Sequence, residues 1–184
     1  HQLKAAENRF APLPLMDELK LEAKEAGLWN LFVPEEHAEY CDHGGLSFFD
    51  YAPLAEIMGR VIWCPEVFNC NAPDTGNMEV FMNYATEAQQ REWLDPLLAG
   101  DIRSSYAMTE PQVASSDATN VELRIEKAGN EWVLNGHKWF ITNAMYERTK
   151  ILIVMGKSDP ENPSRHLQQS QILVPIDTEG VHIL

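Results

Sequence analysis

The sequence predicts an α+β protein in which a helical region precedes a β region. Between residues 15 and 98, the apolar residues recur at the spacing of amphipathic helices. After Asp101 the period of the pattern changes toward two, as it does in strands that bury one face. Helices followed by strands indicate an α+β arrangement, and we place the change near residues 100–103.

The first two predicted helices carry boundary residues. Gly27 follows the last periodic residue of the first helix, a position where glycine commonly ends a helix. Ser47 and Asp50 have the spacing of an N-terminal capping pair, so we expect the second helix to begin after Ser47. Gly59 is the expected end of that helix.

A third helix is predicted from Thr86, which has Gln89 in capping-box position. Its apolar pattern runs to Gly100, and we expect Pro96 to kink or end its final turn.

Strands are predicted after residue 120. Apolar and charged residues alternate over residues 121–126, and a turn at residues 128–130 leads to the apolar run 132–134, which together predict a hairpin. Residues 151–155 and 172–174 are rich in branched side chains and predict two further strands.

Charge and composition exclude several classes of function. The 184 residues include 14 Lys and Arg against 28 Asp and Glu, a formal net charge of -14. Nucleic-acid binding depends on clustered cations, so we expect no nucleic-acid partner. No apolar run is long enough to span a bilayer, so we expect no integral membrane segment. A phosphate-bearing ligand would rely on local N–H groups and hydroxyls.

Cysteines and metal-ligand types predict neither a disulfide framework nor a metal site. Cys41, Cys64 and Cys70 are odd in number and form no CxxC pair, which favours a reducing intracellular compartment. Metal-ligand types gather over residues 35–43 without a common metal spacing, and we expect a surface loop there. The sequence has no GxSxG, Walker A or GxGxxG motif.

Two polar stretches remain as candidate sites. AMTEPQVASSDATN, at residues 107–120, could form a donor-rich rim around a ligand, although composition alone favours a solvated loop. In NGHKWFITNA, at residues 135–144, Asn-Gly predicts a turn and the rings of Trp139 and Phe140 are expected at the start of a strand. These rings could stack on a flat heteroaromatic ligand, and core packing explains the pattern equally well.

Taken in order, these motifs resemble those of the acyl-CoA dehydrogenase family. The family's Thr-Glu-Pro stretch and Ser-Asp pair are similar to YAMTEP at residues 106–111 and SSDAT at residues 115–119. Its Asn-Gly-x-Lys-x-Trp-Ile-Thr pattern resembles NGHKWFITN at residues 135–143. The spelling APDTGNME at residues 72–79 resembles in particular the subgroup of family members ten and eleven.

The resemblance implies a helical N-terminal domain over residues 1–103 and part of a middle β-barrel domain over residues 104–184. In the family a third, helical domain carries the catalytic glutamate, so we expect no catalytic residue in this chain. The implied cofactor is FAD, and the implied reaction is α,β-dehydrogenation of an acyl-CoA thioester in fatty acid β-oxidation. The glutamate removes the α-proton, the β-hydride passes to the flavin, and electron-transfer flavoprotein accepts the electrons.

Two other functions remain open. An acyl-CoA oxidase of the same fold would pass electrons to oxygen, and a non-catalytic interaction module would have lost the flavin. The resemblance also implies a homodimer or homotetramer. We expect an intracellular location, cytoplasmic in a bacterium and mitochondrial or peroxisomal in a eukaryote.

The resemblance also assigns site residues. Those expected to bind FAD are Tyr106, Met108, Thr109, Ser115, Ser116, Phe140, Ile141 and Thr142. Ser116 would also contact the CoA part of the substrate. This chain has one more residue than the family between Glu110 and Asp117, so Ser115 stays an alternative to Ser116. Phe140 stands where the family usually has Trp. Glu110 belongs to the flavin-side loop and is not expected to be the base.

Overall fold

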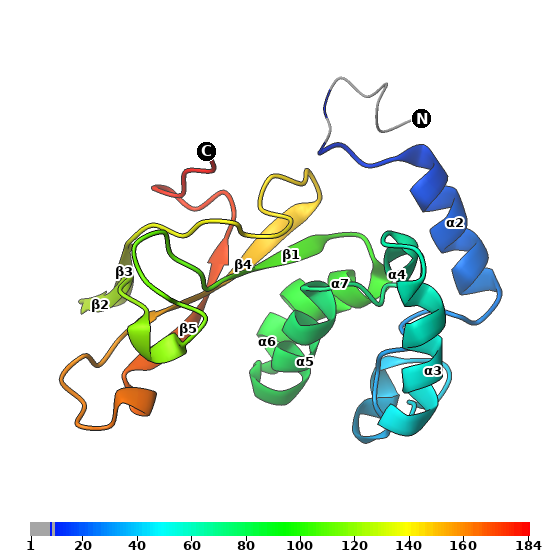
Figure 1. The fold of residues 1–184 in the computed structure, drawn as a ribbon, viewed down its shortest axis with the longest axis horizontal. Helices are drawn as coiled ribbons and strands as arrows, with labels where there is room; N and C mark the ends of the chain where they lie inside the picture. The colour runs from blue at the N-terminus through cyan, green and yellow to red at the C-terminus, as the bar shows by residue number, and fades with distance from the viewer. Residues whose placement is uncertain (1–7, 9) are drawn as a thin grey trace. The chain divides into compact units, whose positions relative to one another are not determined.

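The computed structural model describes residues 8 and 10–184, which form two compact units. The first unit extends to Arg103 and includes Met145–Arg148, and the second comprises Ser104–Ala144 and Thr149–Leu184. The α-helices lie in the first unit and the strands, apart from Arg103, in the second (Figure 1). The predicted α+β class is therefore confirmed. Residues 1–7 and 9 of the predicted helical domain lie outside the described residues.

The first described helix, α2, spans Pro14–Glu25. A proline is tolerated there because the first N–H groups of a helix have no intrahelical partner. Asp17 lies in the first turn and Lys24 in the last, which complements the helix dipole. Gly27 has a φ of 70°, the left-handed conformation that favours glycine, so the predicted end of the helix is confirmed.

Helix α3 spans Phe48–Gly59 and has the predicted N-terminal cap. Ser47 Oγ accepts a hydrogen bond from the Asp50 backbone N–H at 3.1 Å and donates to the Asp50 carboxylate at 2.6 Å. The neighbouring short elements are the 3-10 helix η1, Glu35–Tyr40, and helix α4, Cys64–Val67.

The segment after Thr86 is helical but not a single regular α-helix. Thr86 and Gln89 form the predicted capping box. The elements in order are α6, Glu87–Gln89; the π-helical turn η2, Gln90–Leu94; and α7, Asp95–Ala99. Pro96 lies in the first turn of α7, where its missing N–H is tolerated, and the helix continues to a left-handed Gly100.

Helix α5, Asp74–Tyr84, supplies much of the core of the first unit. Its Met78 and Phe81 are fully buried, as are Leu94 and Leu97 from the helical segment that follows. A side chain at Gly100 would collide with the ring of Trp29, whose Nε1 donates to the Leu98 carbonyl at 2.7 Å. Burial of these apolar side chains is the main favourable contribution to folding.

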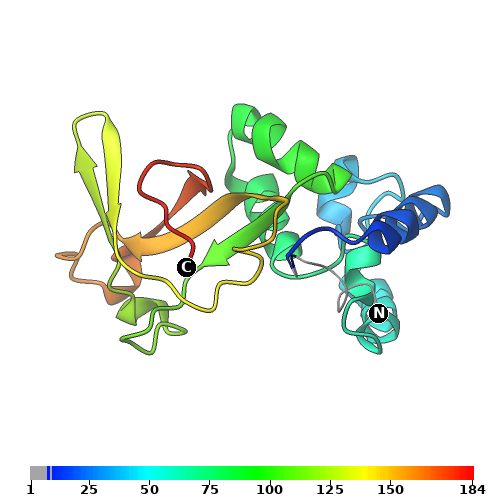
Figure 2. The ribbon, with the colours of Figure 1, turned by 90° about the horizontal axis from the view of Figure 1, so that it is seen from above.

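The five strands of the second unit form one sheet. They are β1, Arg103–Ala107; β2, Arg124–Ala128; β3, Glu131–Asn135; β4, Thr149–Lys157; and β5, Gln169–Pro175. The order is β1-β4-β2-β3, and β5 also pairs with β4. The hairpin β2–β3 and the pair β4–β5 are antiparallel (Figure 2), which confirms the predicted hairpin and the two later strands.

The core of the second unit lies against this sheet. Val121, Leu123 and Ile125 pack with Leu152 and Val154, and all five are buried. β2 and β4 meet in parallel at the ends of both strands. Gly156 permits this close approach, since a Cβ there would lie 2.8 Å from the Leu123 carbonyl oxygen.

Candidate functional site

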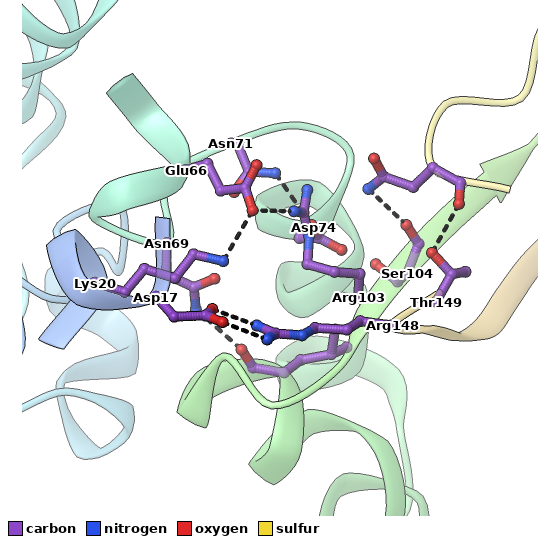
Figure 3. A network of polar contacts seen from close by, with 12 residues as sticks. Asp17, Lys20, Glu66, Asn69, Asn71, Asp74, Arg103, Ser104, Arg148 and Thr149 are labelled. Carbon is purple, nitrogen blue, oxygen red and sulfur yellow. Dashed lines mark hydrogen bonds and ion pairs between the residues drawn. The ribbon is translucent and has the colours of Figure 1, made fainter. Parts of the chain in front are cut away.

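Hydrogen bonds tie the loop 136–144 to β1 within the second unit. Ser104 O accepts from Asn143 Nδ2 at 3.1 Å, and Ser105 Oγ donates to the Thr142 carbonyl at 2.8 Å. Asn143 has a φ of 69°, and its carbonyl accepts from Thr149 Oγ1 at 2.8 Å. Figure 3 shows Ser104 and Thr149 at this position. The bonds fix the main chain around Thr142.

Thr109 and Trp139 form a second connection between the same two stretches. Thr109 Oγ1 donates to the Trp139 carbonyl at 2.6 Å, and the Trp139 backbone N–H donates to the Thr109 carbonyl at 3.0 Å. Each motif thus satisfies backbone groups of the other. Thr109 belongs to the Thr-Glu-Pro (TEP) motif, residues 109–111, and Trp139 belongs to the NGHKWFITN motif, 30 positions later. The two motifs therefore form one structural feature.

Two aromatic rings lie on the loop 136–144. The ring centroids of Trp139 and Phe140 are 4.5 Å apart with an interplanar angle of 36°. Phe140 is 85% exposed and has a φ of 51°, the left-handed conformation that phenylalanine seldom adopts. The loop is irregular and not the start of a strand, so that sequence prediction is wrong. Core packing does not explain the Phe140 ring.

Glu110 is buried at the centre of the TEP motif. Its Oε2 accepts from the Glu122 N–H at 2.7 Å, and its Oε1 accepts from the Leu123 N–H at 2.9 Å. Lys138 Nζ also lies 2.8 Å from Oε1. Burial alone would raise the pKa of the Glu110 carboxyl, but the Lys138 ammonium and these two N–H groups hold it below its ordinary value. The carboxylate is therefore charged, and both of its oxygens already accept hydrogen bonds within the protein.

Lys138 contributes the matching buried cation. Its side chain is 9% exposed, and its ammonium donates to the Met108 carbonyl at 2.8 Å as well as to Glu110. Burial lowers the pKa of this ammonium, while the hydrogen bond and charge of Glu110 act in the opposite direction. The ion pair thus links the backbone on either side of Thr109 to the loop 136–144.

The two candidate serines have different surroundings. Ser115 is 3% exposed, and its Oγ accepts from the Glu110 backbone N–H at 2.6 Å. Ser116 is exposed. Asp117 Oδ1 accepts from the N–H and hydroxyl of Thr119, which orders the turn that follows. Ser115 therefore braces the loop from within, and Ser116 has the accessible hydroxyl.

The remaining predicted site residues lie on the same two stretches. Tyr106 and Met108 are half-buried, and burial raises the pKa of the Tyr106 hydroxyl. Ile141 packs partly against the core of the second unit. Thr142 is exposed. The structure thus brings all eight predicted residues onto two connected segments of one unit.

Sequence reasoning missed the side chains that fasten the site. These are Ser105, Lys138, Asn143 and Thr149, together with the partners of Glu110. One signal was available for the ion pair, because Glu110 and Lys138 are single charges inside otherwise uncharged or apolar motifs. A charge in such a setting needs a partner when it is buried.

A separate buried ion network lies in the first unit (Figure 3). Arg103 contacts Glu66 at 2.7 Å and also pairs with Asp74, while Lys20 contacts Glu66 at 2.8 Å. Burial alone would raise the pKa of the Glu66 carboxyl, but Arg103 and Lys20 hold it below its ordinary value. Arg103 is 4% exposed, so the network acts as an internal brace for this unit.

Asp17 and Arg148 form a bidentate pair in the same unit (Figure 3). Both hydrogen bonds measure 2.6 Å. The hydrogen bond from Arg148 holds the pKa of the Asp17 carboxyl below its ordinary value. This pair joins helix α2 to the segment Met145–Arg148 within the unit.

The part of the chain that the structure describes contains no cluster of metal-ligating side chains and no membrane-spanning helix. No three His, Cys, Asp or Glu side chains there gather as a metal site would require. Residues 35–40 form the 3-10 helix η1, so the expected surface loop is partly helical. None of the described helices is long and apolar enough to cross a bilayer.

The fold and the paired motifs agree with comparisons to known proteins. Residues 3–101 match the acyl-CoA dehydrogenase N-terminal domain, and residues 105–184 match the acyl-CoA dehydrogenase middle domain. The chain belongs to the acyl-CoA dehydrogenase family. The helical unit and the sheet unit correspond to these two domains of the family.

Individual relatives support the same subgroup as the sequence motifs. The chain is 50% identical over 181 residues to acyl-CoA dehydrogenase family member 10 of Mus musculus, covering 98% of this chain and 17% of that protein. It is 50% identical over 178 residues to family member 11 of Gallus gallus, covering 97% and 22% respectively. The chain therefore spans about a fifth of these relatives. The predicted resemblance to family members ten and eleven is confirmed.

A solved structure shows the same architecture. A provisionally assigned acyl-CoA dehydrogenase from Mycobacterium abscessus superposes with a TM-score of 0.88 at 50% identity. The match covers 97% of this chain and 44% of that chain.

Proposed function

We propose that the protein containing this acyl-CoA dehydrogenase chain is an FAD-dependent enzyme that introduces an α,β double bond into an acyl-CoA thioester. The observation that carries the proposal is the reciprocal pairing of Thr109 with Trp139, which joins the two motifs of the family into one feature. Membership of the family supports the reaction class.

The residues present fit a flavin. Phe140 offers an exposed ring beside Trp139, and an exposed aromatic face suits a flat heteroaromatic ligand. Thr109 and Thr142 add hydroxyls on either side of that ring in the sequence. When bound, FAD would supply hydride acceptance, chemistry that side chains do not provide.

Four residues have defined roles in this proposal. Phe140 would pack on the isoalloxazine, and the Thr142 hydroxyl would bond its polar edge. The Thr109 hydroxyl, whose proton goes to the Trp139 carbonyl, would offer that edge its acceptor lone pairs. Ser116 would contact both cofactor and CoA, because its hydroxyl is accessible whereas that of Ser115 is engaged with Glu110. Together these groups hold and orient the reactants, which lowers the entropic part of the barrier.

Glu110 is not the proton acceptor in this proposal. Its two oxygens already accept from Lys138 and from two backbone N–H groups, and the side chain is 4% exposed. A base must reach the proton that it removes. The base is therefore assigned to a glutamate beyond this chain, in the third domain that the family carries.

We further propose that electrons pass to electron-transfer flavoprotein in fatty acid β-oxidation, and that the enzyme is an intracellular homodimer or homotetramer. We propose no nucleic-acid partner, because a chain with a net charge of -14 repels the phosphate backbone.

The test uses the full-length natural polypeptide that carries this sequence. It is purified, its visible spectrum is recorded, and a series of acyl-CoA thioesters is added without oxygen. We expect a yellow protein whose absorbance is bleached by a thioester and restored by electron-transfer flavoprotein. Rapid peroxide formation in air instead would identify an oxidase, and a colourless protein that binds no added FAD would indicate an interaction module.

A further inference from the structure

The buried ion pair of Glu110 and Lys138 is not explained by the stability of the second unit. Removing two charges from water costs free energy that an apolar pair of similar volume does not. Both side chains are nearly excluded from solvent, at 4% and 9% exposed. What an ion pair adds over an apolar contact is direction, because its hydrogen bonds fix particular atoms.

The fixed atoms surround Thr109 on both sides. The carbonyl of Met108 accepts from Lys138 Nζ at 2.8 Å, and the N–H of Glu110 donates to Ser115 Oγ at 2.6 Å. Thr109 itself is held by the two bonds to Trp139. The peptide groups flanking this threonine are therefore placed before any ligand binds.

The pair also fastens the loop 136–144 at Lys138, just before its aromatic residues. Lys138 directly precedes the two aromatic residues, and Phe140 adopts its left-handed conformation with an exposed ring. Glu110 in turn is anchored to the backbone of residues 122 and 123, and Leu123 belongs to the buried core of the unit. A chain of hydrogen bonds thus runs from the core to Lys138, in the loop that carries the exposed ring.

We propose that Glu110 and Lys138 are positioning residues, which set the TEP motif and the loop 136–144 at the separation needed to hold the flavin between Thr109 and Phe140. The inference rests on the proposed function. Preorganised groups bind a ligand more tightly because they lose little conformational entropy when the ligand binds. The pair itself touches neither cofactor nor substrate in this assignment.

Three variants of the full-length protein separate positioning from stability. Lys138→Met leaves Glu110 charged without its cation, and Glu110→Gln leaves Lys138 without its carboxylate. The double variant Glu110→Gln, Lys138→Met contains no unpaired buried charge. Two controls accompany them: Glu87→Gln repeats the substitution at an exposed pair with Arg91, and Ile153→Val removes a methyl group from a buried side chain of β4 in the same unit.

The measurements are the melting temperature of each apoprotein, the dissociation constant for FAD, and the visible circular dichroism of the bound flavin. We expect both single variants to lower the melting temperature and to weaken FAD binding by about tenfold or more, a loss equivalent to one hydrogen bond to a charged group. The double variant should regain most of the melting temperature but not the affinity, and its flavin dichroism should differ from that of the wild type.

The opposite results overturn the inference. FAD affinity in the double variant equal to that of the wild type shows that the pair positions nothing. Affinities that follow melting temperature on the same line as Ile153→Val reduce the pair to a structural role. A wild-type protein that binds no FAD is a different result, because it overturns the proposed function and this inference with it.

Discussion

Thr109 and Trp139 hold each other by two hydrogen bonds, one from the threonine hydroxyl to the tryptophan carbonyl and one from the tryptophan N–H to the threonine carbonyl. The first bond is 2.6 Å long and the second 3.0 Å. Each residue belongs to a different motif of the family. A change at Thr109 should therefore affect the loop 136–144 as well as its own segment.

The first prediction concerns the hydroxyl of Thr109. Thr109→Ala in the full-length protein should weaken FAD retention or slow flavin reduction, because the Trp139 carbonyl loses its donor. Thr109→Ser keeps the hydroxyl and should behave more like the wild type. Flavin content is measured by absorbance and reduction by stopped flow. Unchanged flavin content and reduction rate in the alanine variant would refute the assignment.

The second prediction concerns the exposed ring of Phe140. Phe140→Ala should change the free energy of unfolding by no more than about 0.5 kcal/mol, since the side chain is 85% exposed. It should nevertheless weaken FAD binding, measured by fluorescence titration of the apoprotein. Trp132→Ala is the matched control, because Trp132 is an exposed aromatic residue on β3 outside both motifs. Equal effects of the two variants on FAD affinity would contradict a flavin contact at Phe140.

A third prediction addresses the ion network of the first unit. Arg103→Met leaves the buried Asp74 and the half-buried Glu66 without this partner, and should lower the free energy of unfolding by about 3–5 kcal/mol. Arg91→Met removes an exposed arginine from its pair with Glu87 and should cost less than about 1 kcal/mol. Urea unfolding followed by far-UV circular dichroism measures both. A loss for Arg103→Met as small as that for Arg91→Met would show that the Arg103 network adds little stability.

The fourth prediction is a loss of stability in acid. The pKa of Glu110 lies below its ordinary value of 4.5 in the folded state, so the unfolded chain binds more protons in the interval between the two values. The contribution of Glu110 is thus present above pH 4.5 and is lost as the pH falls through the lower value. Melting temperatures between about pH 3 and about pH 6 should decline less steeply in Glu110→Gln than in the wild type. Parallel declines would exclude this carboxyl as a source of the acid sensitivity.

The fifth prediction compares two glycines. Gly156→Ala should cost about 1–3 kcal/mol, because the added Cβ would lie 2.8 Å from the Leu123 carbonyl oxygen. Gly76→Ala should be neutral or stabilising by up to about 1 kcal/mol, since Gly76 lies in α5 with open space around the new methyl group. Thermal unfolding of both variants checks this difference. A stable Gly156→Ala protein would mean that β2 and β4 do not approach so closely.

Local chemistry made much of the fold predictable from the sequence. The caps at Ser47 and Thr86 and the helix ends at Gly27 and Gly100 were predicted correctly because each depends on residues within one helical turn. The hairpin β2–β3 was equally local. The loop 136–144 was misread as the start of a strand, because its chain direction is set by distant partners such as Ser105.

For the candidate site, too, local features were predictable and contacts between distant residues were not. The sequence by itself determined the order of helical and sheet regions and, through the motifs, the family; the eight flavin residues stay a prediction. Only the tertiary structure distinguished buried Ser115 from exposed Ser116, and only it paired Thr109 with Trp139 and Glu110 with Lys138. These partners stand 28 to 30 positions apart, and no periodic pattern selects one partner over another at that separation. Folding selects them, because a buried charge or hydroxyl is stable only where the chain brings a matching group to it.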